Sequence, residues 1–226
     1  MKKETVEYIV KLVWYFTIFS IIGLIVETLF GFFTMGIWEC RKGFVYGPFC
    51  PIYGFGAVAI ITVLDRFRSS KLKIFLYGMI AGAAVEYLVS FVLEAMYGAR
   101  FWDYSYLPYN LNGRICVQYS SYWGFLSLAM IYLVKPRIDK LIDKIPKKEF
   151  IAKILLIILI IDALLTVLAI NTYQERARRI YNKEEPLQES VITKTIFSND
   201  FMVQTFPNIR LKTDDGKLIF IREIIK

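Results

Sequence analysis

The residues of this sequence that could do chemistry are carboxylates placed inside apolar runs. Glu27, Glu86 and Asp162 lie near the middle of three such runs, and Glu94 lies nearer the end of the run that holds Glu86. A carboxylate at the centre of a bilayer costs about 2.5–3.5 kcal/mol on insertion scales, so such side chains face a protein interior. One carboxylate serves equally well as a polar clamp or as a binding group. The presence of several favours a binding or proton-transfer site.

The carboxylates of the third apolar run belong to a row of residues spaced four apart. The row consists of Gly78, Gly82, Glu86, Ser90, Glu94 and Gly98. On a helix such a row is one inclined ridge, and its GxxxG pattern lets another helix approach closely. The first run offers a matching row in Ser20, Gly23, Glu27 and Gly31. We expect the two rows to face each other, with Glu27 and Glu86 opposed; the alternative is that the small residues only pack.

The loop between the third and fourth apolar runs can supply charges that the runs lack. No lysine or arginine lies in their central turns, so the carboxylates either carry a proton or pair with a cation from elsewhere. The loop reads GARFWDYSYLPYNLNGRIC, and irregular backbone at membrane depth needs cover from protein or water. We expect it to line the mouth of the site through Arg100, Asp103, Asn112 and Arg114.

A second irregular segment, GFVYGPFCPIYGFG, covers residues 43–56. Each proline lacks an amide donor and crowds the preceding turn, so this segment is not one smooth helix. It is too apolar for a solvated loop. We expect a protein-covered, unwound start to the second span, with Tyr46 and Tyr53 near the same mouth. Cys50 here and Cys116 hold related places, and the pattern allows either a disulfide or two buried thiols.

Composition places the chain among polytopic membrane proteins. Of its 226 residues 56% are hydrophobic, with a mean hydropathy of +0.46, whereas soluble domains contain about 45–50% apolar residues. The chain has no histidine, which excludes HExxH enzymes and histidine-based triads. The three cysteines form no CxxC pair, so we expect no metal and no cofactor. The net charge of +8 lies mostly in short loops, which indicates membrane topology and not nucleic-acid binding.

The fold class that follows is an all-α integral membrane protein with five transmembrane helices, since a bilayer core takes about 20 helical residues. The expected spans are residues 8–35, 44–64, 72–97, 117–134 and 150–170. Lysine and arginine are more numerous on the side shared with the N-terminus, which favours a cytoplasmic N-terminus and an external C-terminus. The RARR at 176–179 argues the other way. The first run lacks a cleavage pattern and is expected to stay as a span.

We divide the chain into a transmembrane domain, residues 1–173, and an external tail, residues 174–226. The tail contains NIRLKTDDGKLIFIRE, which predicts two short strands around an Asp-Gly turn. A lone hairpin is marginally stable. We therefore expect it to dock on the loops or on another subunit.

The first and third spans show an internal repeat. GLIVETLFGF (residues 23–32) and GAAVEYLVSF (residues 82–91) share Gly, Val, Glu, Leu and Phe without a gap, and CPIYGF (50–55) echoes YWGF (122–125). Apolar matches between helices arise readily by chance, but a matched mid-span glutamate does not. Because spans one and three run in the same direction, the repeat would be parallel, about an axis along the membrane normal.

Three longer motifs resemble a known bacterial family. KGFVYGPFCPIYGFG, VEYLVSFVLEAMYGARFWDYS and NLNGRICVQYSSYWG are similar to the family described as putative ABC-transporter type IV, also called ABC transporter permeases, over about residues 14–146. The resemblance implies a multi-pass protein of the bacterial cell membrane with a role in transport. The chain has no Walker A sequence, so any ATPase would be a separate subunit.

Three functions fit these observations. A transport or channel component, which we favour, would bind a cation, a proton or a cationic solute at Glu27 and Glu86 in an outward-facing cavity. A membrane-embedded enzyme would act on a lipid or lipid-linked head group, with Glu86 and Glu94 as acid and base and an arginine for phosphate. A structural or partner-binding subunit would use the glutamates only as clamps. The expected partners are membrane lipid, an ATPase subunit or a second copy of the chain.

Overall fold

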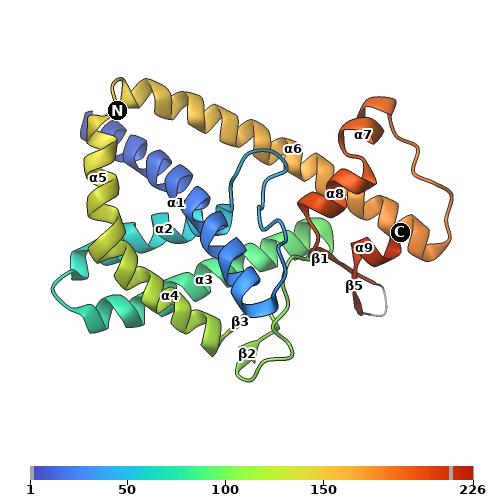
Figure 1. Cartoon of the computed structure of the whole chain (residues 1–226), viewed down its shortest axis with the longest axis horizontal. Helices are drawn as coiled ribbons and strands as arrows, with labels where there is room; N and C mark the ends of the chain where they lie inside the picture. Colours follow the sequence, from blue (N-terminus) through green and yellow to red (C-terminus); the bar gives the residue numbers. More distant parts are fainter. Residues whose placement is uncertain (1–2, 214–215, 226) are drawn as a thin grey trace.

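The computed structural model describes residues 3–213 and 216–225, and it is mostly helical (Figure 1). The helices that precede the tail are α1 (Lys3–Met35), α2 (Pro51–Leu64), η1 (Asp65–Phe67), α3 (Lys71–Tyr97), α4 (Val117–Ala129), η2 (Met130–Val134), α5 (Lys135–Lys144) and α6 (Lys148–Asn182). The loop after α3 holds β1 (Ala99–Arg100), β2 (Asn110–Leu111) and β3 (Ile115–Cys116). The tail holds α7 (Val191–Ile196), α8 (Asn199–Thr205), β4 (Arg210–Lys212), β5 (Leu218–Phe220) and α9 (Ile221–Ile224).

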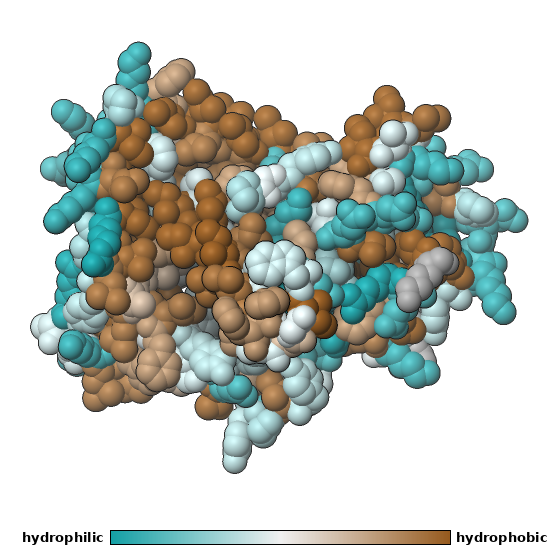
Figure 2. Space-filling view, viewed as in Figure 1, coloured by the Kyte–Doolittle hydropathy of each residue, from teal (hydrophilic) through white to brown (hydrophobic). Residues whose placement is uncertain are grey.

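Three of the helices in the described residues, α1, α3 and α6, are long and apolar enough to cross a membrane. Their directions alternate with those of α2 and α4–α5, which run back across the view of Figure 1. Figure 2 shows a broad hydrophobic surface over the middle of the molecule, with hydrophilic side chains gathered near the start of the chain and over the tail. This distribution fits helices whose outer faces contact lipid.

The bundle is assembled mainly from helices that are neighbours in the sequence. α1 packs on α2, α3 packs on α2 and α4, and α6 covers α1. One apolar core runs through this part and includes Trp14, Ile60, Ile74, Trp123 and Ile131. The α4–α5 stretch is helical throughout but passes through a π turn at η2, and Pro136 follows at once. A proline removes one backbone donor from the helix, which accounts for the irregular turn at this place.

The irregular segment before α2 is held by α6. The backbone N–H of Val45 donates to Thr166 Oγ1 at 2.8 Å, and the N–H of Tyr46 donates to Asp162 Oδ1 at 2.9 Å. Val45 and Cys50 are buried, so protein covers much of the segment, and α2 begins only at Pro51, a residue suited to a first turn. Asp162 is therefore a polar clamp for a stretch of backbone that lacks helical partners.

The C-terminal tail docks on the loop after α3. β4 pairs antiparallel with β1 and with β5, in the order β1-β4-β5. The Asp-Gly turn expected between β4 and β5 includes Asp215, which lies outside the described residues. A second apolar core joins the tail to the bundle through Tyr97, Tyr173, Met202 and Leu211. α6 reaches this core because it continues to Asn182, well beyond the expected end of the span at residue 170.

Candidate functional site

The row of small and polar residues on α3 is buried, but it does not face α1. Gly78, Gly82, Glu86 and Ser90 are all buried on α3. A Cβ added at Gly82 would overlap the Trp123 side chain of α4, and one at Gly78 would overlap Ser127 of the same helix. The expectation that the rows of spans one and three face each other is therefore wrong. Gly82 makes room for the Trp123 ring of the next helix in the sequence, and Gly78 makes room for Ser127.

Glu86 lies at the centre of this contact with two neutral donors. Tyr104 Oη donates to Glu86 Oε1 at 2.8 Å, and Trp123 Nε1 donates to Oε2 at 3.1 Å. Only 5% of Glu86 is exposed. Burial, followed by the charge and hydrogen bond of Glu86, raises the pKa of Tyr104 well above its ordinary value. Tyr104 thus keeps its proton and acts as a donor.

Glu27 has an equivalent but simpler setting on α1. Tyr53 Oη of α2 donates to Glu27 Oε2 at 2.7 Å, and a Cβ added at Gly23 would overlap the Tyr53 ring. The Tyr53 and Trp123 rings contact each other, with centroids 5.4 Å apart. Each glutamate therefore bonds to one of two aromatic side chains that touch, and no direct hydrogen bond joins the two carboxylates within the described residues.

No cation among the described residues forms a hydrogen bond or an ion pair with Glu27 or Glu86, whose partners are Tyr53, Tyr104 and Trp123. A carboxylate in an apolar bundle is tolerated when it is neutralised by a proton or a bound cation, or when hydrogen bonds satisfy it. Neutral donors satisfy both oxygens of Glu86 and one oxygen of Glu27 without removing the carboxylate charge. The inner part of the site can therefore accept a proton or a small cation.

A separate outer cluster forms where α3 ends. Glu94 Oε2 lies 2.5 Å from Arg100 Nε and 3.0 Å from Arg114 Nη2, and Glu94 Oε1 lies 2.8 Å from Lys212 Nζ. Asp103 joins through Arg100 at 3.7 Å. Opposite charges at these distances stabilise one another, most where solvent is excluded. The sequence-predicted residues Glu94, Arg100, Asp103 and Arg114 thus do come together, at one end of α3.

Two other predicted residues, Asn112 and Tyr46, lie outside the centre of either site. Asn112 Nδ2 donates to Tyr87 Oη at 2.9 Å, and the Asn112 carbonyl accepts from Arg100 Nη1 at 3.1 Å, so Asn112 borders the outer cluster. Tyr46 is 40% exposed and lies 6.2 Å from the Phe201 ring of the tail. Tyr46 therefore serves the contact between tail and bundle, away from both carboxylate sites.

Four residues of these sites were not predicted: Tyr104, Trp123, Arg210 and Lys212. Trp123 had a signal, because it stands in YWGF where Tyr53 stands in CPIYGF. Arg210 Nη1 pairs with Asp103 Oδ2 at 3.1 Å. The two tail cations reach the cluster because β4 pairs with β1, and no local pattern announces a contact between residues so distant in the sequence.

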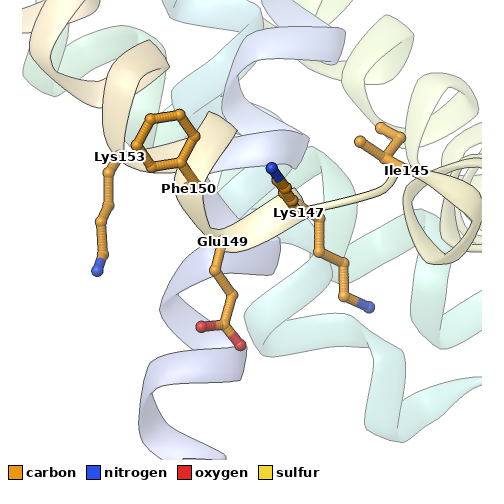
Figure 3. A pocket seen from close by; sticks show the side chains of 6 residues that line it. Ile145, Lys147, Glu149, Phe150 and Lys153 are labelled. Carbon is orange, nitrogen blue, oxygen red and sulfur yellow. The ribbon is translucent and has the colours of Figure 1, made fainter.

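Cavities adjoin the end of α3 and the start of α6. One of about 260 Å³ adjoins the outer cluster and is lined in part by Glu94, Arg114 and Lys212. The other, of about 470 Å³, lies at the turn from α5 to α6. Its side chains, including Lys147, Glu149 and Lys153, point away from one another (Figure 3), so they form no convergent site.

Within residues 3–213 and 216–225, no group of three or more Cys, Asp or Glu side chains is arranged to hold a metal ion. Cys50 and Cys116 are buried free thiols, so of the two alternatives the structure has the thiols and not the disulfide.

The sequence was compared with family models, with curated proteins and with solved structures. No curated protein and no solved structure matched. The family model described as putative ABC-transporter type IV matches residues 14–167. The match begins in α1 and ends in α6, and it includes both glutamates, their aromatic donors and the loop after α3. The tail lies beyond it. The chain therefore belongs to the family described as putative ABC-transporter type IV.

Proposed function

We propose that this chain is a permease-like component of a membrane transporter and that Glu27 and Glu86 take up a proton or a small cation during transport. One observation carries the proposal: both carboxylates lie in apolar helices and bond to neutral aromatic donors, without a cationic partner among the described residues. Intramembrane carboxylates in such settings mark ion pathways and proton relays.

A parallel repeat of two helix pairs supports a site between two halves. In the first half the rings of Phe16 and Phe55 lie 5.0 Å apart at 68°, and in the second half those of Phe75 and Phe125 lie 4.9 Å apart at 65°. These are the positions that the sequence repeat pairs.

The glycines continue the correspondence. Gly54 lies against Phe16 and Ser20, and Gly124 lies against Phe75 and Met79, at the matched positions. Tyr53 and Trp123 are also matched and touch each other, which supports a pseudo-twofold axis between them.

The proposed membrane arrangement has five spans, with α2 and the α4–η2 stretch completing the three long helices. It comprises a transmembrane domain of residues 1–173 with a cytoplasmic N-terminus and an external tail of residues 174–226. The outer cluster then lies at the external mouth, in the loop that the tail covers. Membrane lipid surrounds the bundle, and an ATPase subunit or a second copy of the chain is the proposed protein partner.

The proposal is tested by flux in proteoliposomes. Proton flux under an imposed pH gradient is followed with an enclosed pH dye, and Na⁺ uptake is followed in parallel. We expect Glu27→Gln with Glu86→Gln to abolish the flux, because glutamine keeps the side-chain volume but cannot take up a proton or balance a cation. Glu149→Gln, a change at the α5–α6 turn, is the matched control.

Thermal stability of the same samples separates transport from a clamp. The alternative, a structural role, has its own support because both oxygens of Glu86 already accept hydrogen bonds. If flux is absent in the unmodified protein, or persists in the double variant, the proposal fails. If flux falls only in proportion to stability, the glutamates are clamps.

A further inference from the structure

The outer cluster carries more positive than negative charge. Its members are Arg100, Arg114, Arg210 and Lys212 with Glu94 and Asp103. Among the described residues four cations thus share two carboxylates, which leaves an excess of two positive charges in this part of the network. A cluster of this kind attracts an anion, and the field is strongest where low-dielectric walls surround it.

The cavity of about 260 Å³ opens beside this network. Arg114 and Lys212 line it, and among the described residues that line it Glu94 is the one carboxylate. Glu94 already contacts Arg100, Arg114 and Lys212, so its charge is compensated within the cluster. An anion that enters therefore meets unbalanced cations and not a free carboxylate.

Arg114 lines this cavity, and one of its buried donors is unused in the described part of the chain. Its side chain is 9% exposed, its Nη1 donates to Ser90 Oγ at 3.2 Å, and its Nη2 pairs with Glu94. Its Nε has no hydrogen-bond partner within the described part of the chain. A buried charged donor without an acceptor is unfavourable, and the guanidinium fork suits the paired oxygens of a phosphate.

The cavity also borders an exposed apolar strip on α3. Leu88, Phe91 and Met96 are 60%, 51% and 55% exposed, and Phe91 lines the cavity itself. α3 is one of the helices that can cross a membrane, and the cavity lies at its end. A phosphate bound there would thus lie at the level where a phospholipid carries its head group, with the strip free for an acyl chain.

We propose that this cavity binds a phosphate group, through Arg114 and Lys212 with Arg100 beside them, either as the head group of an anionic phospholipid or as a free phosphate. The site lies outside the Glu27–Glu86 region and includes a tail residue beyond the family match. It goes beyond the proposed transport function, because it would exist whether or not the inner carboxylates conduct.

The test measures binding to the full-length protein, without reference to flux. Delipidated protein is titrated with phosphatidylglycerol and with phosphatidylcholine and followed by native mass spectrometry, and inorganic phosphate is titrated by calorimetry. We expect Arg114→Gln to weaken phosphate-group binding about tenfold or more, as for the loss of a charge-assisted hydrogen bond. Lys212→Gln, at a 45% exposed side chain, should weaken it several-fold without disturbing the fold.

Lys194→Gln, an exposed lysine of the same tail, is the control and should bind normally. Preferential binding of phosphatidylglycerol assigns the site to lipid, and binding of inorganic phosphate assigns it to a soluble anion. If neither binds, or if the affinity in the Lys212→Gln protein equals that of Lys194→Gln, the proposal is overturned. Should Arg114→Gln fail to fold, the Lys212 and Lys194 pair still decides.

Discussion

The two helix pairs α1–α2 and α3–α4 use the same contacts around their glutamates but cover them differently. Glu27 accepts one hydrogen bond, from Tyr53, and is half-buried. Glu86 accepts two, from Trp123 and from Tyr104 of the following loop, and is buried. The extra donor comes from the long loop after α3, and the first half has a shorter connection there.

This difference gives the two glutamates of the proposed repeat unequal roles in the proposed uptake. Glu86, with both oxygens bonded and little exposure, also contributes more to holding the second half together. Glu27 has spare acceptor capacity and more access, so it is the better candidate to exchange a proton or a cation. The contrast also extends outward, because Ser90 hydrogen-bonds to Arg114 whereas the matched Gly31 lies beside Arg41 without a side chain of its own.

The largest predicted effect comes from removing the ring of the second half. Trp123→Ala deletes a buried ring and one donor of Glu86, so it should lower the free energy of unfolding by about 3–5 kcal/mol. Tyr53→Ala should cost less, because the Tyr53 side chain is less buried and its removal affects the more open glutamate. Denaturant titration in bicelles measures both. Equal losses would contradict the division of tasks between the halves.

The matched glycines give the next prediction, which tests the repeat itself. Gly23→Ala and Gly82→Ala each place a methyl group against a ring of the next helix, Tyr53 or Trp123. Overpacking of this kind costs about 1–3 kcal/mol, and the two losses should be similar because the contacts are equivalent. Ile80→Ala, on an exposed face of α3, is the control for a substitution that touches neither ring. A large cost in only one half would argue against equivalent packing.

Several features of this arrangement could be predicted from the sequence, and those that could not be predicted have physical causes. The row of residues spaced four apart on α3 predicted the buried face that holds Gly82 and Glu86, since periodicity reports which side of a helix is small or polar. Periodicity does not report which helix covers that side, and the helix that covers it is α4 and not α1.

The outer cluster shows even more strongly that a sequence pattern does not report which elements pack together. Glu94 and Arg114 could be placed at one mouth because a single loop connects their elements. Arg210 and Lys212 could not, because their position depends on the pairing of β4 with β1, and a three-residue strand carries little information about its partner. Contacts between neighbours in the sequence were therefore easier to predict than contacts made by the tail.

The smallest predicted effect concerns the matched pair Ser90 and Gly31. Ser90→Gly removes the hydroxyl that accepts from Arg114 Nη1, so it should destabilise the protein by about 1 kcal/mol. Gly31→Ser adds a hydroxyl at a buried position where a Cβ would lie 3.2 Å from Arg41 Nη2, which pairs with Glu39 at 3.6 Å. A shift of the end of this long side chain admits the added group, so the change should cost less than Ser90→Gly. The same bicelle titration compares them. If Gly31→Ser were as costly as Ser90→Gly, Arg41 would be held as firmly as Arg114. The two halves would then each have a fixed cation beside the row that carries the glutamate, and the contrast between them would fail.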